Sequence, residues 1–166
     1  MHVLILGLGI SGVSTAKALK KLGAKISITD LKKEEELKDY INQLDGMDVN
    51  LILGTNSVPL DGVDLIVKSP GIPLKIDIIK EAKERSIDVI TDLELAYRLF
   101  PNRNYIAITG TNGKTTTTTL TGQLFKEAGF TTHVSGNIGV GILWDLINSQ
   151  DEDVFVIETS SFQLEN

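Results

Sequence analysis

The sequence predicts an α/β protein with a parallel sheet, and two observations predict it. Short β-branched runs alternate with amphipathic stretches through the first hundred residues, which is typical of strands joined by covering helices. Two glycine-rich turns, at residues 7–12 and 110–116, each follow a strand-like run and open a helical stretch. This pattern predicts a Rossmann-like domain over residues 1–100 and the start of a second βα domain over residues 101–166.

The first domain is predicted to hold five strands. In the first helical stretch, Val13, Ala16 and Leu19 recur every three residues, so one face is expected to pack on the sheet. Thr91 and Glu94 have the spacing of a capping box, which predicts a short closing helix. The predicted strands are residues 3–6, 26–29, 49–53, 65–67 and 88–90, the other helices are residues 32–44 and 76–85, and residues 101–104 are a linker.

The second domain is predicted to begin with a strand at residues 105–109. After the glycine turn a helix runs to Ala128 and is stopped by Gly129. Strands are expected again at residues 132–135 and 154–158. Only three strands are predicted in residues 101–166.

Composition excludes several classes of protein. The 166 residues carry a net charge of −6, which disfavours nucleic acid as a partner, so any phosphate has to be bound locally. The absence of cysteine excludes disulfides, thiolate zinc sites and a cysteine nucleophile. No apolar run approaches the length needed to span a membrane. We expect a cytoplasmic monomer that binds neither nucleic acid nor a membrane.

The first glycine turn predicts a phosphate or nucleotide site. Gly7, Gly9 and Gly12 form G-x-G-x-x-G, and Asp30 stands at the end of the second predicted strand. Asp30 is placed to accept hydrogen bonds from ribose hydroxyls. The alternative is a tight turn without a ligand, with Asp30 capping the next helix. Residues 69–71 also follow a strand, so three turns are expected to meet at one rim of the sheet and form a pocket.

The second glycine turn predicts a phosphate-binding loop. Residues 108–119 read ITGTNGKTTTTT, a shortened variant in which Ile108 stands where a glycine is expected. Backbone N–H groups are expected to cradle phosphates, with Lys114 reaching the β and γ phosphates and the Thr115 hydroxyl binding Mg²⁺. The alternative is a surface turn with an exposed lysine.

Two further residues are candidates for the same site. Glu158, at the end of the last predicted strand, is the expected carboxylate for the metal, unless it is a capping or solvated side chain. Asn137 follows another strand and could face the same cleft, or could be an ordinary turn residue.

Four segments together resemble the Mur ligase family, the ATP-dependent acid–amino-acid ligases of bacterial cell-wall synthesis. They are GLGISG at residues 7–12, KSPGIP at 68–73, GTNGKTT at 110–116 and ETSSFQL at 158–164. The third is typical of the whole family, folate-type ligases included, whereas the others point to the branch that adds D-glutamate. The resemblance runs from end to end of the chain and implies a P-loop ATPase domain after the Rossmann-like one.

The resemblance implies which residues bind each substrate. The first domain would hold the UDP part of UDP-N-acetylmuramoyl-L-alanine rather than NAD. ATP would bind the second glycine turn and Mg²⁺ would bind Thr115 and Glu158, with Lys114 and Glu158 as the catalytic residues. The implied substrate-binding residues are Gly9, Ile10, Ser11, Asp30, Leu31, Lys32, Gly71 and Asn137, and the implied ATP-binding residues are Gly110, Thr111, Asn112, Gly113, Lys114, Thr115 and Thr116.

The reaction implied begins when the substrate carboxylate attacks the γ-phosphate of ATP to give an acyl phosphate, from which the amine of D-glutamate displaces phosphate. Family members continue with a carbamylated lysine, a histidine for a second metal and a C-terminal domain that binds the amino acid. None of these follows Asn166, so we expect the N-terminal part of a ligase that binds UDP-substrate but does not turn over alone. The alternatives are another Mur or folate-type ligase, a nucleotide-sensing binding module and an NAD-dependent oxidoreductase.

Overall fold

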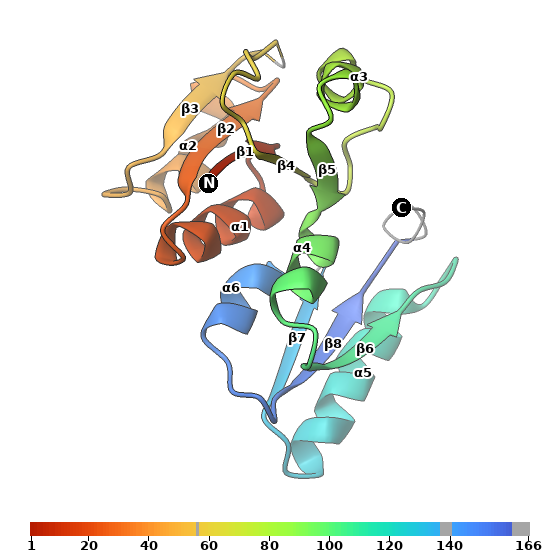
Figure 1. The fold of residues 1–166 in the computed structure, drawn as a ribbon. Coiled ribbons are helices and arrows are strands. Elements are labelled where there is room, and N and C mark those ends of the chain that lie inside the picture. Colours follow the sequence, from red (N-terminus) through yellow and green to blue (C-terminus); the bar gives the residue numbers. More distant parts are fainter. Residues whose placement is uncertain (56, 137–140, 161–166) are drawn as a thin grey trace. The chain divides into compact units, whose positions relative to one another are not determined.

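The computed structural model describes residues 1–55, 57–136 and 141–160. It divides into two compact units, Met1–Asp92 and Leu93–Asn166 (Figure 1). No helix in the described part of the chain is long and apolar enough to cross a membrane. Both units are parallel-sheet α/β structures, so the predicted fold class is confirmed.

The first unit is built on five parallel strands in the order β3-β2-β1-β4-β5. The first strand lies in the middle because the chain builds outward through β2 and β3 and then crosses over to β4. The strand order therefore reverses between β1 and β4, and open α/β sheets bind ligands beyond the carboxyl ends of the strands at such a point. The strands are β1 (His2–Leu6), β2 (Lys25–Asp30), β3 (Asn50–Leu53), β4 (Leu65–Lys68) and β5 (Asp88–Thr91).

Helices cover both faces of this sheet. Successive residues of a strand point to opposite faces, and the side chains of residues 3–6 in β1 are buried on both. Leu4 and Leu6 belong to a core cluster with Ile79 of α3, whereas Ile5 lies under Gly12 of α1. The helices are α1 (Ile10–Lys21), α2 (Glu34–Asn42) and α3 (Asp77–Glu84), whereas α4 (Asp92–Leu99) belongs to the second unit from Leu93 on.

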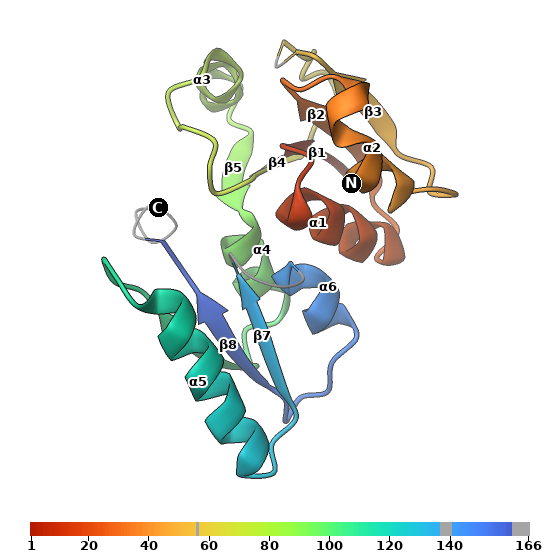
Figure 2. The same cartoon turned by 180° about the vertical axis from the view of Figure 1, so that it is seen from behind.

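The second unit holds three parallel strands in the order β6-β8-β7. Helix α5 lies on the face of β7 that carries Val134, since a Cβ on Gly122 would stand 2.4 Å from that side chain. Helix α6 lies on the other face, where Ser135 donates a hydrogen bond to Asp145 (2.7 Å). Figure 2 shows α5 running along the sheet. The elements are β6 (Asn104–Ile108), α5 (Lys114–Glu127), β7 (Thr132–Gly136), α6 (Ile142–Ile147) and β8 (Val154–Glu158).

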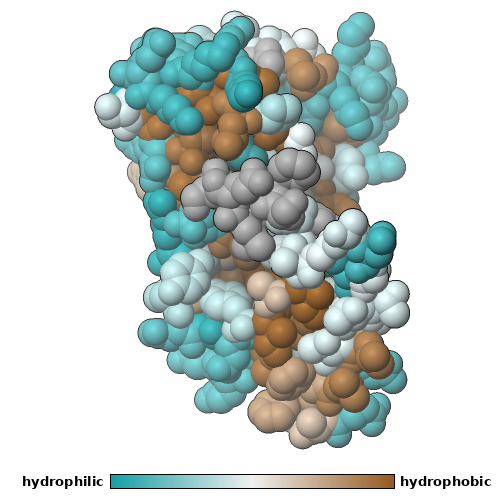
Figure 3. Space-filling view, turned by 90° about the vertical axis from the view of Figure 1, so that its right-hand side faces the viewer, coloured by the Kyte–Doolittle hydropathy of each residue, from teal (hydrophilic) through white to brown (hydrophobic). Residues whose placement is uncertain are grey.

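The outer face of α5 carries large apolar side chains in contact with solvent. Leu120 and Leu124 are 55% and 61% exposed, and Phe130, just beyond the helix, is 50% exposed. Figure 3 shows apolar surface on the face of the second unit that it presents. The residues that α5 buries are small, Thr118 and Gly122.

The elements differ from the sequence-based expectation at a few places. Helix α6 was not predicted, because six residues are too few to show a helical period. Helix α2 spans Glu34–Asn42 rather than residues 32–44, and β6 already begins at Asn104, which was predicted to be linker. These are shifts of helix and strand ends and leave the order of elements unchanged.

Candidate functional site: two glycine turns at the carboxyl ends of the strands

The first glycine turn connects the middle strand of the first sheet to α1. The N–H of Gly7 donates to the carbonyl of Thr29 at 2.8 Å, which fixes the turn against β2. Gly12 packs so closely that a Cβ there would stand 2.1 Å from the carbonyl oxygen of Gly7. At Gly9, by contrast, a Cβ would meet nothing within 4 Å. Gly12 is therefore needed for packing, and Gly9 leaves open space at the helix start, where N–H groups favour an anion.

A cavity of about 540 Å³ opens beside this turn. Its volume lies in the range of small-molecule sites. It is bounded by the three turns that follow β1, β2 and β4, as the sequence predicted. The predicted substrate-binding residues on its lining are Gly9, Asp30, Leu31, Lys32 and Gly71.

The Asp30 carboxylate ties two of these turns together. Its Oδ2 accepts a hydrogen bond from the N–H of Leu8 (2.8 Å), and its Oδ1 accepts one from the N–H of Lys32 (2.9 Å). A carboxylate has about four lone-pair sites, so two remain for a ligand. Asp30 thus has a structural role that does not exclude the predicted one.

The other predicted substrate-binding residues lie elsewhere. Ile10 and Ser11 are in the first turn of α1 and are not among the residues that line the cavity. The Ser11 hydroxyl donates to Asp92 Oδ2 at 2.6 Å, so its proton is already engaged. Asn137 lies outside the described residues.

One wall of the cavity was missed by sequence reasoning. It is apolar, and its residues come from α2 and from the segment after Ser69. The spacing of Leu37 and Tyr40, three residues apart on α2, indicates a shared helix face, but the sequence does not say what that face meets. The missed lining residues are Leu37, Tyr40, Ile72, Pro73 and Ile76.

The second glycine turn lies between β6 and α5. Gly113, at the N-cap of α5, has φ of +74°, a left-handed conformation that glycine adopts without strain. Lys114 is the first residue of the helix, and its Nζ donates to the carbonyl of Gly110 (2.8 Å). The loop and its lysine therefore lie where N–H groups at a helix start are free for phosphate oxygens. The predicted ATP-binding residues Gly110, Thr111, Asn112, Gly113, Lys114, Thr115 and Thr116 are contiguous across this turn.

Thr115 and Glu158 come together as predicted for a metal site. The Thr115 hydroxyl donates to Glu158 Oε2 at 2.7 Å, although 43 residues separate them. The parallel register places Ile108, Glu158 and Gly136 side by side at the carboxyl ends of β6, β8 and β7. The loop after Ile108 therefore begins next to Glu158.

The donor set at this point fits Mg²⁺. The Glu158 carboxylate is buried, with the residue 6% exposed, and it accepts its hydrogen bond from the neutral hydroxyl of Thr115. Mg²⁺ is commonly held by one or two protein oxygens together with substrate phosphates and water. No group of three or more His, Cys, Asp or Glu that could hold a metal by itself occurs among the described residues.

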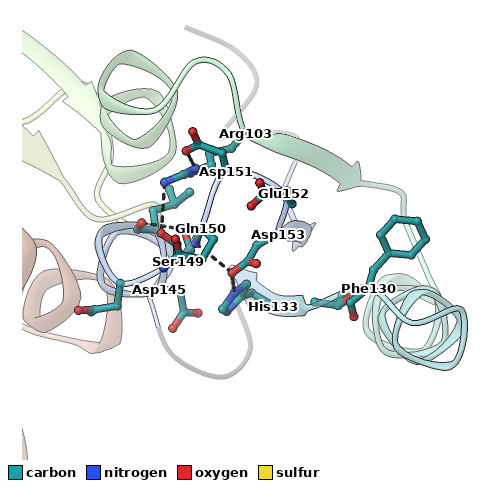
Figure 4. A network of polar contacts seen from close by, with 12 residues as sticks. Arg103, Phe130, His133, Asp145, Ser149, Gln150, Asp151, Glu152 and Asp153 are labelled. Atoms are coloured by element: carbon teal, nitrogen blue, oxygen red, sulfur yellow. Dashed lines mark hydrogen bonds and ion pairs between the residues drawn. The ribbon is translucent and has the colours of Figure 1, made fainter.

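A second polar cluster lies at the opposite, amino-terminal edge of the same sheet (Figure 4). His133 Nε2 pairs with Asp153 Oδ2 at 2.7 Å, and the imidazole stacks on Phe155 with centroids 4.7 Å apart. Arg103 pairs with Asp151 and also donates to the carbonyl of Ser149. These contacts join the starts of the three strands and lie away from the glycine turn, so we assign them to structure.

The chain matches two family models. Residues 1–91 match the model described as Mur ligase MurD-like, N-terminal domain. Residues 108–166 match the model described as Mur ligase middle domain. The two matched ranges contain the first and the second glycine turn, respectively.

Curated relatives match over nearly the whole chain. The UDP-N-acetylmuramoylalanine–D-glutamate ligase of Alkaliphilus oremlandii is 46% identical over 171 residues, covering 99% of this chain and 37% of the relative. The enzyme of the same name from Clostridioides difficile is 44% identical over 165 residues, again covering 99% of this chain and 37% of the relative. The chain thus spans little more than a third of the length of these relatives.

Solved structures share the fold. A UDP-N-acetylmuramate:L-alanyl-gamma-D-glutamyl-meso-diaminopimelate ligase from Neisseria meningitides superposes with a TM-score of 0.64 at 22% identity, covering 97% of this chain and 54% of that one. The UDP-N-acetylmuramate-alanine ligase MurC from Thermotoga maritima gives 0.55 at 20% identity, covering 96% and 37%. At these identities the likeness supports the fold alone.

Proposed function

The chain belongs to the Mur ligase family, whose members are ATP-dependent amide-bond ligases, and on this premise we propose that it takes part in adding D-glutamate to UDP-N-acetylmuramoyl-L-alanine. The cavity at the switch point of the first sheet carries this proposal. It offers the helix start at Gly9, the carboxylate of Asp30 and the Lys32 side chain to a nucleoside diphosphate. We propose that residues 1–100 bind the UDP part of the substrate and that residues 101–166 bind ATP.

In this proposal the second glycine turn holds the phosphates of ATP. Its N–H groups and the Lys114 ammonium would bind phosphate oxygens, and Thr115 and Glu158 would hold Mg²⁺. Mg²⁺ supplies charge neutralisation on the phosphoryl group when it is bound. Lys114 offsets the same charge from the other side, while the protein holds the reacting carboxylate and phosphate in line.

The proposed reaction conserves each group. A carboxylate oxygen of UDP-N-acetylmuramoyl-L-alanine attacks the γ-phosphorus of ATP, giving an acyl phosphate and ADP. The amine of D-glutamate then attacks the acyl carbon, the amide forms and phosphate leaves. We place this reaction in the cytoplasm and propose a monomer that acts without nucleic acid or membrane partners; Ile10, Ser11 and Asn137 stay predicted contacts of the substrate.

Calorimetric titration tests the substrate. UDP-N-acetylmuramoyl-L-alanine should give saturable binding to the 166-residue chain. NADH is the control ligand, because the fold alone also suits a dinucleotide. At the same concentrations NADH should give no binding. The substitution Lys32→Met should weaken the first titration, and Lys83→Met, on the exposed side of α3, is the matched control. Binding of NADH together with no binding of the UDP compound would instead favour an NAD-dependent oxidoreductase.

A further inference from the structure

Two charged side chains are buried in the first unit. In the described part of Met1–Asp92 they are Lys68, 4% exposed, and Asp92, 7% exposed. Lysine and aspartate are almost never buried so fully unless they are paired. Neither residue lines the cavity, and sequence reasoning gave neither of them a role in binding.

The strand register brings these two residues to the same edge of the sheet. Lys68 is the last residue of β4 and pairs with Thr91 of β5, and Asp92 follows Thr91 directly. Burial lowers the pKa of the Lys68 ammonium, and the negative charge of Asp92 offsets part of that shift. The register therefore places the two charged residues close together at the carboxyl ends of β4 and β5.

Each member of the pair holds one of the turns around the cavity. Lys68 Nζ donates to the carbonyl oxygen of Ile72 at 3.1 Å, and Ile72 lines the cavity. Asp92 Oδ2 accepts from the hydroxyl of Ser11 at 2.6 Å, and Ser11 lies in the first turn of α1, two residues after Gly9. The turn after β4 and the start of α1 are thus each bonded to one of two buried charged residues that the strand register brings close together.

We propose that Lys68 and Asp92 are a positioning pair, which sets the separation between the start of α1 and the turn after β4 and thereby the affinity of the cavity for a nucleoside diphosphate. The inference rests on the proposed function, since it concerns the same cavity. Neither residue touches the ligand; both act through Ser11 and Ile72.

Energetics favour this role over simple stabilisation. A buried ion pair often stabilises a protein no more than apolar residues of similar volume do, because both charges lose their hydration. Removal of one partner, however, leaves the other charge buried and uncompensated. The pair is therefore expected to be sensitive to single substitutions, and the groups that it bonds at Ser11 and Ile72 belong to the two turns themselves.

A double-mutant cycle measured as ligand affinity tests the proposal. Lys68→Met, Asp92→Asn and the double variant are titrated with UDP-N-acetylmuramoyl-L-alanine beside the unchanged chain. Asp92→Asn keeps an oxygen that accepts from Ser11 while removing the charge. Each single substitution should weaken binding by about tenfold relative to the unchanged chain. The double variant should also lose about tenfold, rather than the product of the two single losses.

Controls separate positioning from stability. Lys80→Met removes a lysine whose side chain is 60% exposed and which pairs with Asp77 on its own helix, so it should leave the affinity unchanged. Lys68→Arg, which keeps the charge, should recover part of the affinity lost in Lys68→Met. Thermal unfolding reports the folded fraction of every variant, and affinities are compared per folded molecule.

The outcomes are distinct. The proposal is supported if both single variants bind more weakly and their losses do not multiply in the double variant. Unchanged affinity in the folded Lys68→Met and Asp92→Asn chains, even with lower thermal stability, overturns it, and so do independent, multiplicative losses. If the unchanged chain does not bind the UDP compound at all, the proposed function itself fails.

Discussion

The two glycine turns both join a strand to a helix, but the helices that follow them are held differently. Helix α1 buries Ala16 and Leu19 at 0% and 1% exposure, whereas α5 leaves Leu120 and Leu124 at 55% and 61%. Helix α5 is held instead by the close approach of Gly122 to β7. A glycine turn that presents N–H groups therefore depends on the backbone at the turn and not on deep burial of the helix behind it.

Truncation of one leucine in each helix should give the largest difference in stability between α1 and α5. Leu19→Ala should cost about 2–5 kcal/mol of unfolding free energy, because a fully buried side chain leaves a cavity. Leu124→Ala should stay within about 0.5 kcal/mol, because the side chain is already in solvent. Urea unfolding measures both, and equal losses would show that the exposed face of α5 is covered in solution.

Glycine substitutions should separate packing from binding in the first turn. Gly12→Ala forces a Cβ against the Gly7 carbonyl and should cost about 1–3 kcal/mol, a fall in melting temperature of roughly 5–20 °C. Gly9→Ala meets no atom in the protein. It should keep the melting temperature and lose affinity for the UDP compound. A Gly9→Ala chain that binds normally would mean that the phosphates lie elsewhere.

Removal of the loop lysine should affect the second turn alone. Lys114→Met should weaken the binding of ATP with Mg²⁺ roughly 10- to 100-fold, the equivalent of charge-assisted hydrogen bonds worth about 1.5–3 kcal/mol. Binding of the UDP compound should be unchanged. Lys126→Met, in the last turn of the same helix, is the matched control. Equal ATP affinity in both variants would contradict the assignment of the loop.

The two units should respond oppositely to alkaline pH, and this is the smallest effect. Burial raises the pKa of Tyr105 to about 12, and its hydroxyl donates to the carbonyl of Phe100 (2.8 Å). Its folded pKa is above the unfolded value of about 10, so its contribution is present below pH 10 and lost as pH rises towards 12. Burial lowers the pKa of Lys68 in the folded chain. Its contribution to the free energy of unfolding therefore grows as pH rises towards the pKa of lysine in the unfolded chain.

Phenolate absorbance during a pH titration checks the Tyr105 prediction. One of the three tyrosines should titrate late in the folded chain. Tyr105→Phe should remove that step and flatten the loss of urea stability above pH 10. A folded chain whose tyrosines all titrate together near the ordinary pKa would contradict it.

Much of the fold followed from local pattern. The β-branched runs, the glycine turns and the three-residue spacing of Val13, Ala16 and Leu19 are short-range signals, and they predicted the elements with ends shifted by a few residues. The six residues of α6 gave no such signal. The order β3-β2-β1-β4-β5 was not read from the sequence either, because it depends on where the chain crosses the sheet.

The site was predictable where function is local. The residues of each glycine turn are contiguous, and carboxyl ends of parallel strands meet, so the contact of Thr115 with Glu158 could be expected. The pair of Lys68 and Asp92 could not be expected, because 24 residues separate them and only the register of β4 and β5 aligns them. The apolar cavity wall was missed because helix faces do not reveal what they pack against.

Asp30 has a further consequence for the thermodynamics of binding. Its two oxygens hold the N–H groups of Leu8 and Lys32, so the turns after β1 and β2 share one anchor. Their conformational entropy is lost when the unit folds and not when a ligand arrives, which preorganises the cavity. Much of the affinity lost on removing this carboxylate would then be entropic, and calorimetry would record it as a less favourable entropy of binding.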